Sequence, residues 1–196
     1  MDRANILQDT ICGERIMSLR RGHERKTKRI SQEKLATMFR TANSKISRDI
    51  IEDIESGERD IFDIEIVWFA KILDTTVEYL TGISNNYETR FDEHDTEIDD
   101  SMKDRVNICG KWLRKARKQF PGKMSQQTLS SRMREHGFDF KYYSILQIEK
   151  GARRVRLSEM RAFAEILGIP LMFLFKGDNR KLPNIESFES YAAQDD

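Results

Sequence analysis

Apolar residues recur along the chain at intervals of three and four, the spacing that places side chains on one face of an α-helix. In residues 11–82 this pattern predicts five short helices with inward-facing positions Ile16, Leu19, Leu35, Phe39, Ile51, Ile54, Ile66, Phe69, Leu73, Val77 and Leu80. Residues 108–177 predict five more, with inward-facing positions Leu113, Ala116, Leu129, Met133, Ile145, Ile148, Met160, Phe163, Leu167, Leu171 and Leu174. No alternating strand pattern competes with these segments. The sequence therefore predicts an all-α fold.

The two predicted groups of helices are copies of one unit. Shifting the sequence by 94 positions aligns residues 31–82 with 125–176 without a gap, and 15 of the 52 aligned residues are identical. Upstream, Ile11-Cys12-Gly13 recurs as Ile108-Cys109-Gly110, so the second copy has a shorter first loop. Self-similarity over this length predicts two copies of one small domain.

The repeat also predicts where the domains begin and end. We expect an N-terminal domain over 1–82, an acidic linker over 83–102, a C-terminal domain over 103–177 and an acidic tail over 178–196. The linker is polar and acidic, a composition typical of a solvated connection.

Helix ends are predicted at equivalent places in the two copies. Ser31 and Ser125 precede the second apolar segment of their copies, where a serine hydroxyl can accept a hydrogen bond from a backbone N–H of the first turn. Gly57 and Gly151 follow the third segment and can adopt the left-handed conformation that ends a helix.

Charge is distributed unevenly along the chain, although the formal net charge is only +1. Residues 108–177 contain 15 basic and 5 acidic residues, whereas residues 11–82 contain 13 of each. A strongly positive half joined to a neutral half is typical of a protein in which one part binds nucleic acid.

Several motifs resemble those of a known family. Ser31-Gln32, Leu35-Ala36, the segment Ile54-Glu55-Ser56-Gly57-Glu58-Arg59 and the segment Phe69-Ala70-Lys71-Ile72-Leu73 resemble the helix-turn-helix domain of phage repressors and Xre-type regulators. The second copy shows the same order in Ser125-Gln126, Ile148-Glu149-Lys150-Gly151-Ala152-Arg153 and Phe163-Ala164-Glu165-Ile166-Leu167. The resemblance implies two lambda-repressor-like domains of about five helices each. It also implies binding of double-stranded DNA and regulation of transcription, as a repressor that occludes a promoter.

The third predicted helix presents chemically different faces in the two copies. If Ile51 and Ile54 point inward, a 100° step per residue places Asp49, Glu52, Asp53 and Ser56 on the outward face of the first copy. The same construction exposes Tyr143, Leu146, Gln147 and Lys150 in the second. Carboxylates are repelled by phosphates, whereas glutamine can read adenine through two hydrogen bonds. The second domain is therefore expected to be the main DNA reader.

The candidate DNA-binding residues follow from these faces and from the resemblance. In the second domain they are Gln126, Lys141, Tyr142, Tyr143, Gln147, Lys150, Arg153 and Arg154. In the first domain they are Gln32, Ser47, Arg48 and Arg59. The resemblance implies that Gln126 and Lys141, like Gln32 and Ser47, contact the DNA backbone. The basic run from Arg20 to Arg29 is a further candidate for phosphate contact, although such runs are commonly solvated loops.

Other classes of function have less support. The sequence has no glycine-rich phosphate loop, no paired-histidine metal motif and no plausible catalytic arrangement, so we expect no enzyme, no metal and no cofactor. Cys12 and Cys109 stand at equivalent places in the two copies, where we expect a core role, and two cysteines cannot form a disulfide framework. No membrane span or secretory signal is recognisable, which predicts a cytoplasmic protein.

Assembly leaves several alternatives open. A homodimer is one alternative. Ile185, Phe188 and Tyr191 in the tail are candidates for contact with a partner. No feature points to a small-molecule inducer. The rival hypothesis is a protein-interaction adaptor, antitoxin-like or antirepressor-like, whose helix-turn-helix copies bind a partner protein; the acidic third helix of the first copy favours it.

Overall fold

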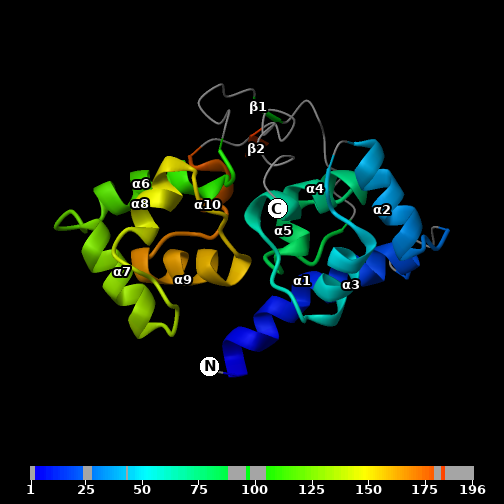
Figure 1. Cartoon of the computed structure of the whole chain (residues 1–196), viewed down its shortest axis with the longest axis horizontal. Helices are drawn as coiled ribbons and strands as arrows, with labels where there is room; N and C mark the ends of the chain where they lie inside the picture. Colours follow the sequence, from blue (N-terminus) through cyan, green and yellow to red (C-terminus); the bar gives the residue numbers. More distant parts are fainter. Residues whose placement is uncertain are drawn as a thin grey trace. The chain divides into compact units, whose positions relative to one another are not determined.

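The computed structural model describes residues 3–23, 28–42, 44–87, 96–97, 105–178 and 182–183. These residues form ten helices, five from each copy of the repeat (Figure 1). The first copy contains α1 (Arg3–Arg21), α2 (Gln32–Thr41), α3 (Arg48–Ser56), α4 (Asp63–Ile72) and α5 (Val77–Leu80). The second contains α6 (Cys109–Gln119), α7 (Gln126–Glu135), α8 (Ser144–Lys150), α9 (Leu157–Leu167) and α10 (Phe173–Lys176). The all-α prediction is confirmed.

Extended structure is minor in the described part of the chain. Strand β1 (Thr96–Glu97) pairs in parallel with β2 (Leu182–Pro183), and each has two residues. Among the described helices, none is long and apolar enough to cross a membrane.

The described residues separate into two units. The first consists of residues 3–23, 28–42, 44–61 and 65–87, and the second of residues 62–64, 96–97, 105–178 and 182–183. The second unit thus includes a three-residue segment from the first half of the sequence, in which Phe62 forms an isolated antiparallel bridge with Arg156.

In both units the first helix packs closely against the third. This approach depends on the glycine of the repeated Ile-Cys-Gly motif. A Cβ atom at Gly13 would lie 2.1 Å from the carbonyl oxygen of Ile54, and one at Gly110 would lie 1.9 Å from that of Ile148. Because real Cβ atoms do not approach so closely, only glycine fits at these two positions.

The predicted core is buried with one exception. All the inward-facing positions predicted for the first copy are buried, and Phe39 packs edge-on against Phe69 with ring centroids 4.8 Å apart. In the second copy Leu171 is only half-buried. It lies in a tight turn before α10, where Phe173 and Leu174 donate backbone hydrogen bonds to residues three positions earlier. The last helix therefore begins at Phe173, and Phe175 joins the core beside Leu174.

The predicted helix caps are confirmed. The Ser31 hydroxyl accepts a hydrogen bond from the Lys34 N–H (3.1 Å), and the Ser125 hydroxyl accepts one from the Thr128 N–H (2.9 Å). Gly57 and Gly151 end α3 and α8 with φ values of 78° and 81°. Side chains other than glycine adopt this left-handed conformation at a cost.

The N-terminus of α6 is capped by a residue distant in sequence. Asp63 is completely buried in the second unit, and its Oδ2 accepts hydrogen bonds from the backbone N–H groups of Ile108 (2.7 Å) and Cys109 (2.9 Å). Its Oδ1 accepts a third from the Ile64 N–H (2.8 Å). Burial nevertheless raises the pKa of Asp63 to about 7, because desolvation of the carboxylate outweighs these three hydrogen bonds.

This raised pKa predicts a pH dependence of stability. Between the ordinary value of 3.8 and about 7 the folded protein retains a proton on Asp63 that the unfolded chain releases. The free energy of unfolding should therefore fall as the pH rises through this window and level off above it, with a slope that Asp63 steepens by up to about 1.4 kcal/mol per pH unit.

Urea unfolding at a series of pH values measures this slope. The Asp63→Asn variant should lose the contribution, since it keeps a carbonyl acceptor for α6 but cannot ionise. Asp49→Asn, which changes an exposed residue of α3, should retain it. Identical slopes for the parent and Asp63→Asn would contradict the prediction.

Candidate nucleic-acid interface

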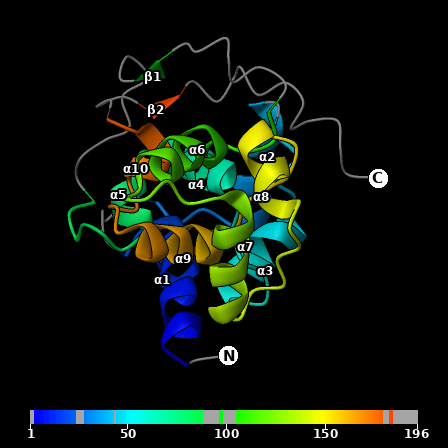
Figure 2. The same cartoon turned by 90° about the vertical axis from the view of Figure 1, so that its left-hand side faces the viewer.

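The third helix of the second unit, α8, presents the face that the helical periodicity predicts. Ile145, Ile148 and Glu149 are buried beneath it. Leu146, Gln147 and Lys150 are exposed, as is Tyr143 just before the helix. In Figure 2, α7 and α8 lie side by side, and the two helices are in contact.

The turn between α7 and α8 is held from below by hydrogen bonds. The Ser130 hydroxyl donates to the carbonyl oxygen of Lys141 (2.9 Å), and the Arg134 guanidinium donates to that of Phe140 (2.9 Å). Phe140 is itself buried, with its ring 5.7 Å from that of Phe163. These contacts fix the backbone that carries Lys141, Tyr142 and Tyr143.

Helix α8 begins later than the corresponding helix of the first unit. In the first unit the Ser47 hydroxyl accepts a hydrogen bond from the Ile50 N–H (3.3 Å) and caps α3, which starts at Arg48. The equivalent position in the second unit is Lys141, which has no acceptor in its side chain. Here the Lys141 N–H donates a hydrogen bond to the Ser144 hydroxyl (3.0 Å), which closes a turn, and α8 starts at Ser144.

The delayed start leaves two tyrosines at the tip of the turn. Tyr142 is 74% exposed and Tyr143 is 38% exposed. Their rings are nearly perpendicular, with centroids 5.4 Å apart. Lys141, which the resemblance predicts to contact the DNA backbone, lies exposed three residues before α8 begins.

A buried ion pair joins the first helix of the second unit to the end of α8. The Arg117 guanidinium donates through Nε to Oε1 of Glu149 (2.5 Å) and through Nη2 to Oε2 (2.9 Å), while Nη1 donates to the carbonyl oxygen of Met124 (2.8 Å). The side-chain amide of Gln126 completes the cluster by donating to Glu149 Oε2 (2.7 Å). Gln126, predicted to contact DNA, thus uses its amide to hold Glu149.

The first unit repeats the same cluster with its own residues. Arg20 donates to both carboxylate oxygens of Glu55 (2.6 and 2.7 Å) and to the carbonyl oxygen of Ile30 (2.8 Å). Gln32 donates to Glu55 Oε2 (2.9 Å). Gln32 therefore occupies the same internal position as Gln126, and Arg20 of the basic run is buried rather than solvated.

A second ion pair recurs in both units and contains two further candidate DNA-binding residues. Arg153 donates to Glu159 Oε1 (2.6 Å), and Arg59 donates to Glu65 Oε1 (2.7 Å). Both glutamates are buried. The Arg153 guanidinium also lies over the Phe140 ring, 4.7 Å from its centroid. The sequence contained a signal for these pairs, because the arginine and the glutamate recur together in both copies.

Arg154 also packs within the second unit. Its guanidinium lies over the ring of Phe62, 5.5 Å from the centroid, and the side chain is partly exposed.

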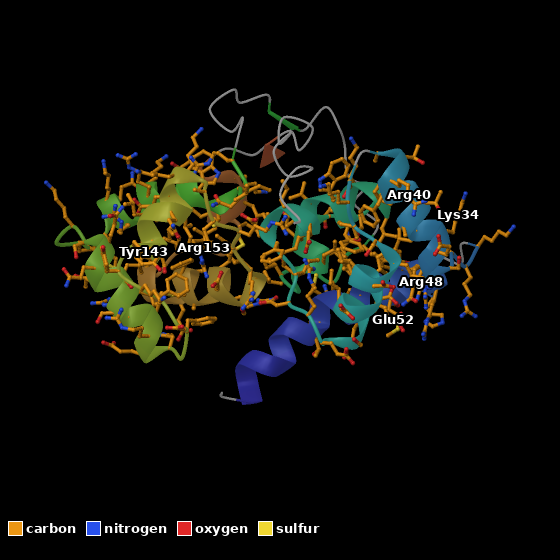
Figure 3. All side chains as sticks on the ribbon, viewed as in Figure 1. Lys34, Arg40, Arg48, Glu52, Tyr143 and Arg153 are labelled. Atoms are coloured by element: carbon orange, nitrogen blue, oxygen red, sulfur yellow. The ribbon has the colours of Figure 1, made fainter. Side chains whose placement is uncertain are left out.

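The outward face of α3 in the first unit is ionic. Arg48 Nη2 lies 3.2 Å from Glu52 Oε2, one helical turn away, and both side chains are about half exposed (Figure 3). Asp49 is exposed beside them and Asp53 is partly exposed. The positions equivalent to Arg48 and Glu52 in the second unit are Tyr142 and Leu146.

The first unit also has a surface pocket of about 330 Å³ that is rich in arginine. It is lined by Arg20, Arg21, Arg29, Ser31, Gln32, Glu33 and Arg48. Arg21 and Arg29 are exposed, so the pocket offers guanidinium groups of the kind that bind phosphate. Arg25 and Lys26 of the basic run lie outside the described residues, as do Ile185, Phe188 and Tyr191 of the tail.

Within the described residues, no group of His, Cys, Asp and Glu is arranged to hold a metal ion. Both cysteines are buried as free thiols, and burial near Asp63 raises the pKa of Cys109. A thiol of raised pKa is a poor nucleophile.

No family model matches the chain, and no curated protein or solved structure is detectably similar to it.

Breaking the buried ion pair should cost much more stability than breaking an exposed one. Glu149→Ala should lower the free energy of unfolding by about 3–5 kcal/mol, because it leaves the Arg117 charge buried and uncompensated. Glu52→Ala, which breaks the exposed pair with Arg48, should change it by no more than about 0.5 kcal/mol.

Chemical denaturation followed by circular dichroism measures both changes. The double variant Arg117→Met/Glu149→Leu should recover much of the lost stability, since paired removal leaves no lone charge. A cost of less than about 1 kcal/mol for Glu149→Ala would contradict the role given to the cluster.

Proposed function

We propose that the chain is a sequence-specific double-stranded DNA-binding regulator of transcription that acts as a repressor, with the second unit as its main DNA reader. The observation that carries this proposal is the exposed face of α8, where Gln147 and Lys150 lie on a rigidly supported helix. Residues 108–177, which contain that helix, have ten more basic than acidic residues. An excess of positive charge around an exposed helix suits entry into the major groove.

We further propose that each unit is a lambda-repressor-like helix-turn-helix domain, with α2–α3 and α7–α8 as the equivalent helix pairs. Three side chains of the second unit carry the contacts in this proposal. Gln147 reads adenine, and Lys141 and Lys150 contact phosphates on either side of the groove. Gln126 and Arg153 act indirectly, by holding α8 and the loop that follows it through Glu149 and Glu159. Occupation of a promoter by this protein in the cytoplasm would exclude the polymerase.

The first unit would contribute differently to DNA binding. Its arginine-lined pocket beside the start of α2 suits a backbone phosphate, whereas the acidic α3 does not suit the floor of the groove. The first unit would therefore add affinity without reading much sequence, either on the same duplex or within a homodimer.

A second candidate function is a protein-interaction adaptor. The exposed carboxylates Asp49 and Glu52 on α3 favour it, because they would fit a basic partner protein better than DNA. The positive second unit favours DNA instead.

Selection from a pool of random duplexes at physiological salt separates these functions. Recovery of one enriched motif supports reading by one unit, and two motifs about 34 Å apart support reading by both. Bulk binding without enrichment, or no binding at all, would contradict the proposed function. A stoichiometric protein partner retained after nuclease treatment would then support the adaptor.

Substitutions on α8 should separate base reading from phosphate contact. Gln147→Ala should weaken binding to the selected duplex by about 1–3 kcal/mol and relax the preference at one base pair. Lys150→Ala should weaken binding to all duplexes alike and reduce the slope of log affinity against log salt by about one.

Fluorescence anisotropy over a salt series, on the selected duplex and its single-base variants, measures both effects. Asp53→Ala is the matched control for Gln147→Ala, because it occupies the equivalent position on α3, and it should leave the base preference unchanged. An equal loss on every duplex for Gln147→Ala would refute its role as a reader.

A further inference from the structure

Exposed apolar side chains are concentrated at one place in the second unit. Among the described residues, four large hydrophobic side chains are exposed, and three of them are Tyr142, Tyr143 and Leu146. These three residues, which we call the apolar tip, lie at the start of α8 and the turn before it. Tyr143 lies three positions before Leu146 and four before Gln147, so Tyr143, Leu146 and Gln147 share one face of the helix.

The fold itself does not require this apolar tip. The first unit has the same Arg–Glu–Gln cluster beneath its third helix but carries Arg48, Asp49 and Glu52 at the equivalent positions. There the ion pair between Arg48 and Glu52 satisfies both charges at the surface. Because one scaffold supports either chemistry, the apolar residues of the second unit are explained better by a ligand than by folding.

We propose that the apolar tip contacts the 5-methyl groups of thymines in the major groove, so that the second unit selects A·T pairs by their methyl groups. This inference rests on the proposed function. The thymine methyl is the apolar group that base pairs present in the major groove, and an adjacent adenine edge is the partner of a glutamine amide. Lys141 directly precedes the apolar tip in the sequence and Lys150 lies one helical turn after Leu146, and both lysines are exposed and can meet the phosphates that border the groove.

The backbone beneath the apolar tip is held by hydrogen bonds. The carbonyl oxygens of Phe140 and Lys141 are tied to Arg134 and Ser130, and the Ser144 hydroxyl closes the turn. Backbone that is already held in this way need not be ordered when the apolar tip makes its contact. Leu146 stands directly before Gln147 on α8, so one A·T pair or two neighbouring pairs can satisfy both residues.

Replacement of thymine by deoxyuridine tests this inference, because it removes the methyl group and keeps every hydrogen-bonding group of the pair. On the duplex selected from the random pool, each thymine is replaced in turn and the affinity of the full-length protein is measured. At a contacted thymine the affinity should fall about fourfold, the value of one buried methyl group. For Leu146→Ala the ratio of thymine to deoxyuridine affinity should fall from about four to about one at one of these positions.

Glu52→Ala, at the position equivalent to Leu146 in the first unit, is the matched control and should keep the parent ratio. Equal affinities for thymine and deoxyuridine duplexes at every position would overturn the inference and leave the proposed function intact, whereas absence of any preferred duplex would overturn both. A lower oligomeric mass for Leu146→Ser, with no methyl dependence in the parent, would assign the apolar tip to contact with a second copy and also overturn the inference.

Discussion

The buried arginine–glutamate pair is the interaction on which the arrangement of each unit depends. Three segments meet at one carboxylate: the first helix through Arg117, the second through Gln126, and the third through Glu149 itself. A buried charge is stable only where its partners are fixed, so the pair restricts how these helices can move relative to one another. Arg117 also donates to the carbonyl of Met124 in the loop before α7, so the loop is held by the same group.

Because both units have the same internal frame, the outer face of the third helix is free to differ between them. The residues beneath α3 and α8 are nearly the same in kind, whereas the exposed residues change from the ion pair of Arg48 and Glu52 to Tyr142 and Leu146. Exposed ion pairs contribute little to stability, and exposed apolar groups contribute less, so neither set is there to hold the fold. The proposed function attributes the difference to what the two units bind.

Much of this architecture could be predicted from the sequence, because helical periodicity and an internal repeat are local signals. The caps at Ser31 and Ser125 and the exposed face of α8 follow from them directly. The partner of Gln126 could not be assigned from spacing alone, since a polar side chain at a helix start suits solvent, DNA or a buried carboxylate equally well. The capping of α6 by Asp63 had no local signal, because the carboxylate and the N–H groups are separated by 45 and 46 residues.

The internal pairing also indicates where the positive charge of the second unit acts. Of the 15 basic residues in 108–177, Arg117 and Arg153 are paired with Glu149 and Glu159. Removing these pairs leaves 13 basic residues against three acidic ones, so the excess is carried by the remaining side chains, including exposed Lys141 and Lys150. Two of the five acidic residues in this range, Glu149 and Glu159, thus serve the frame, while the other three are exposed among a larger number of cations. Such a separation lets a unit be both rigid inside and strongly attractive to polyanions outside, which neutral pairing over the whole surface would prevent.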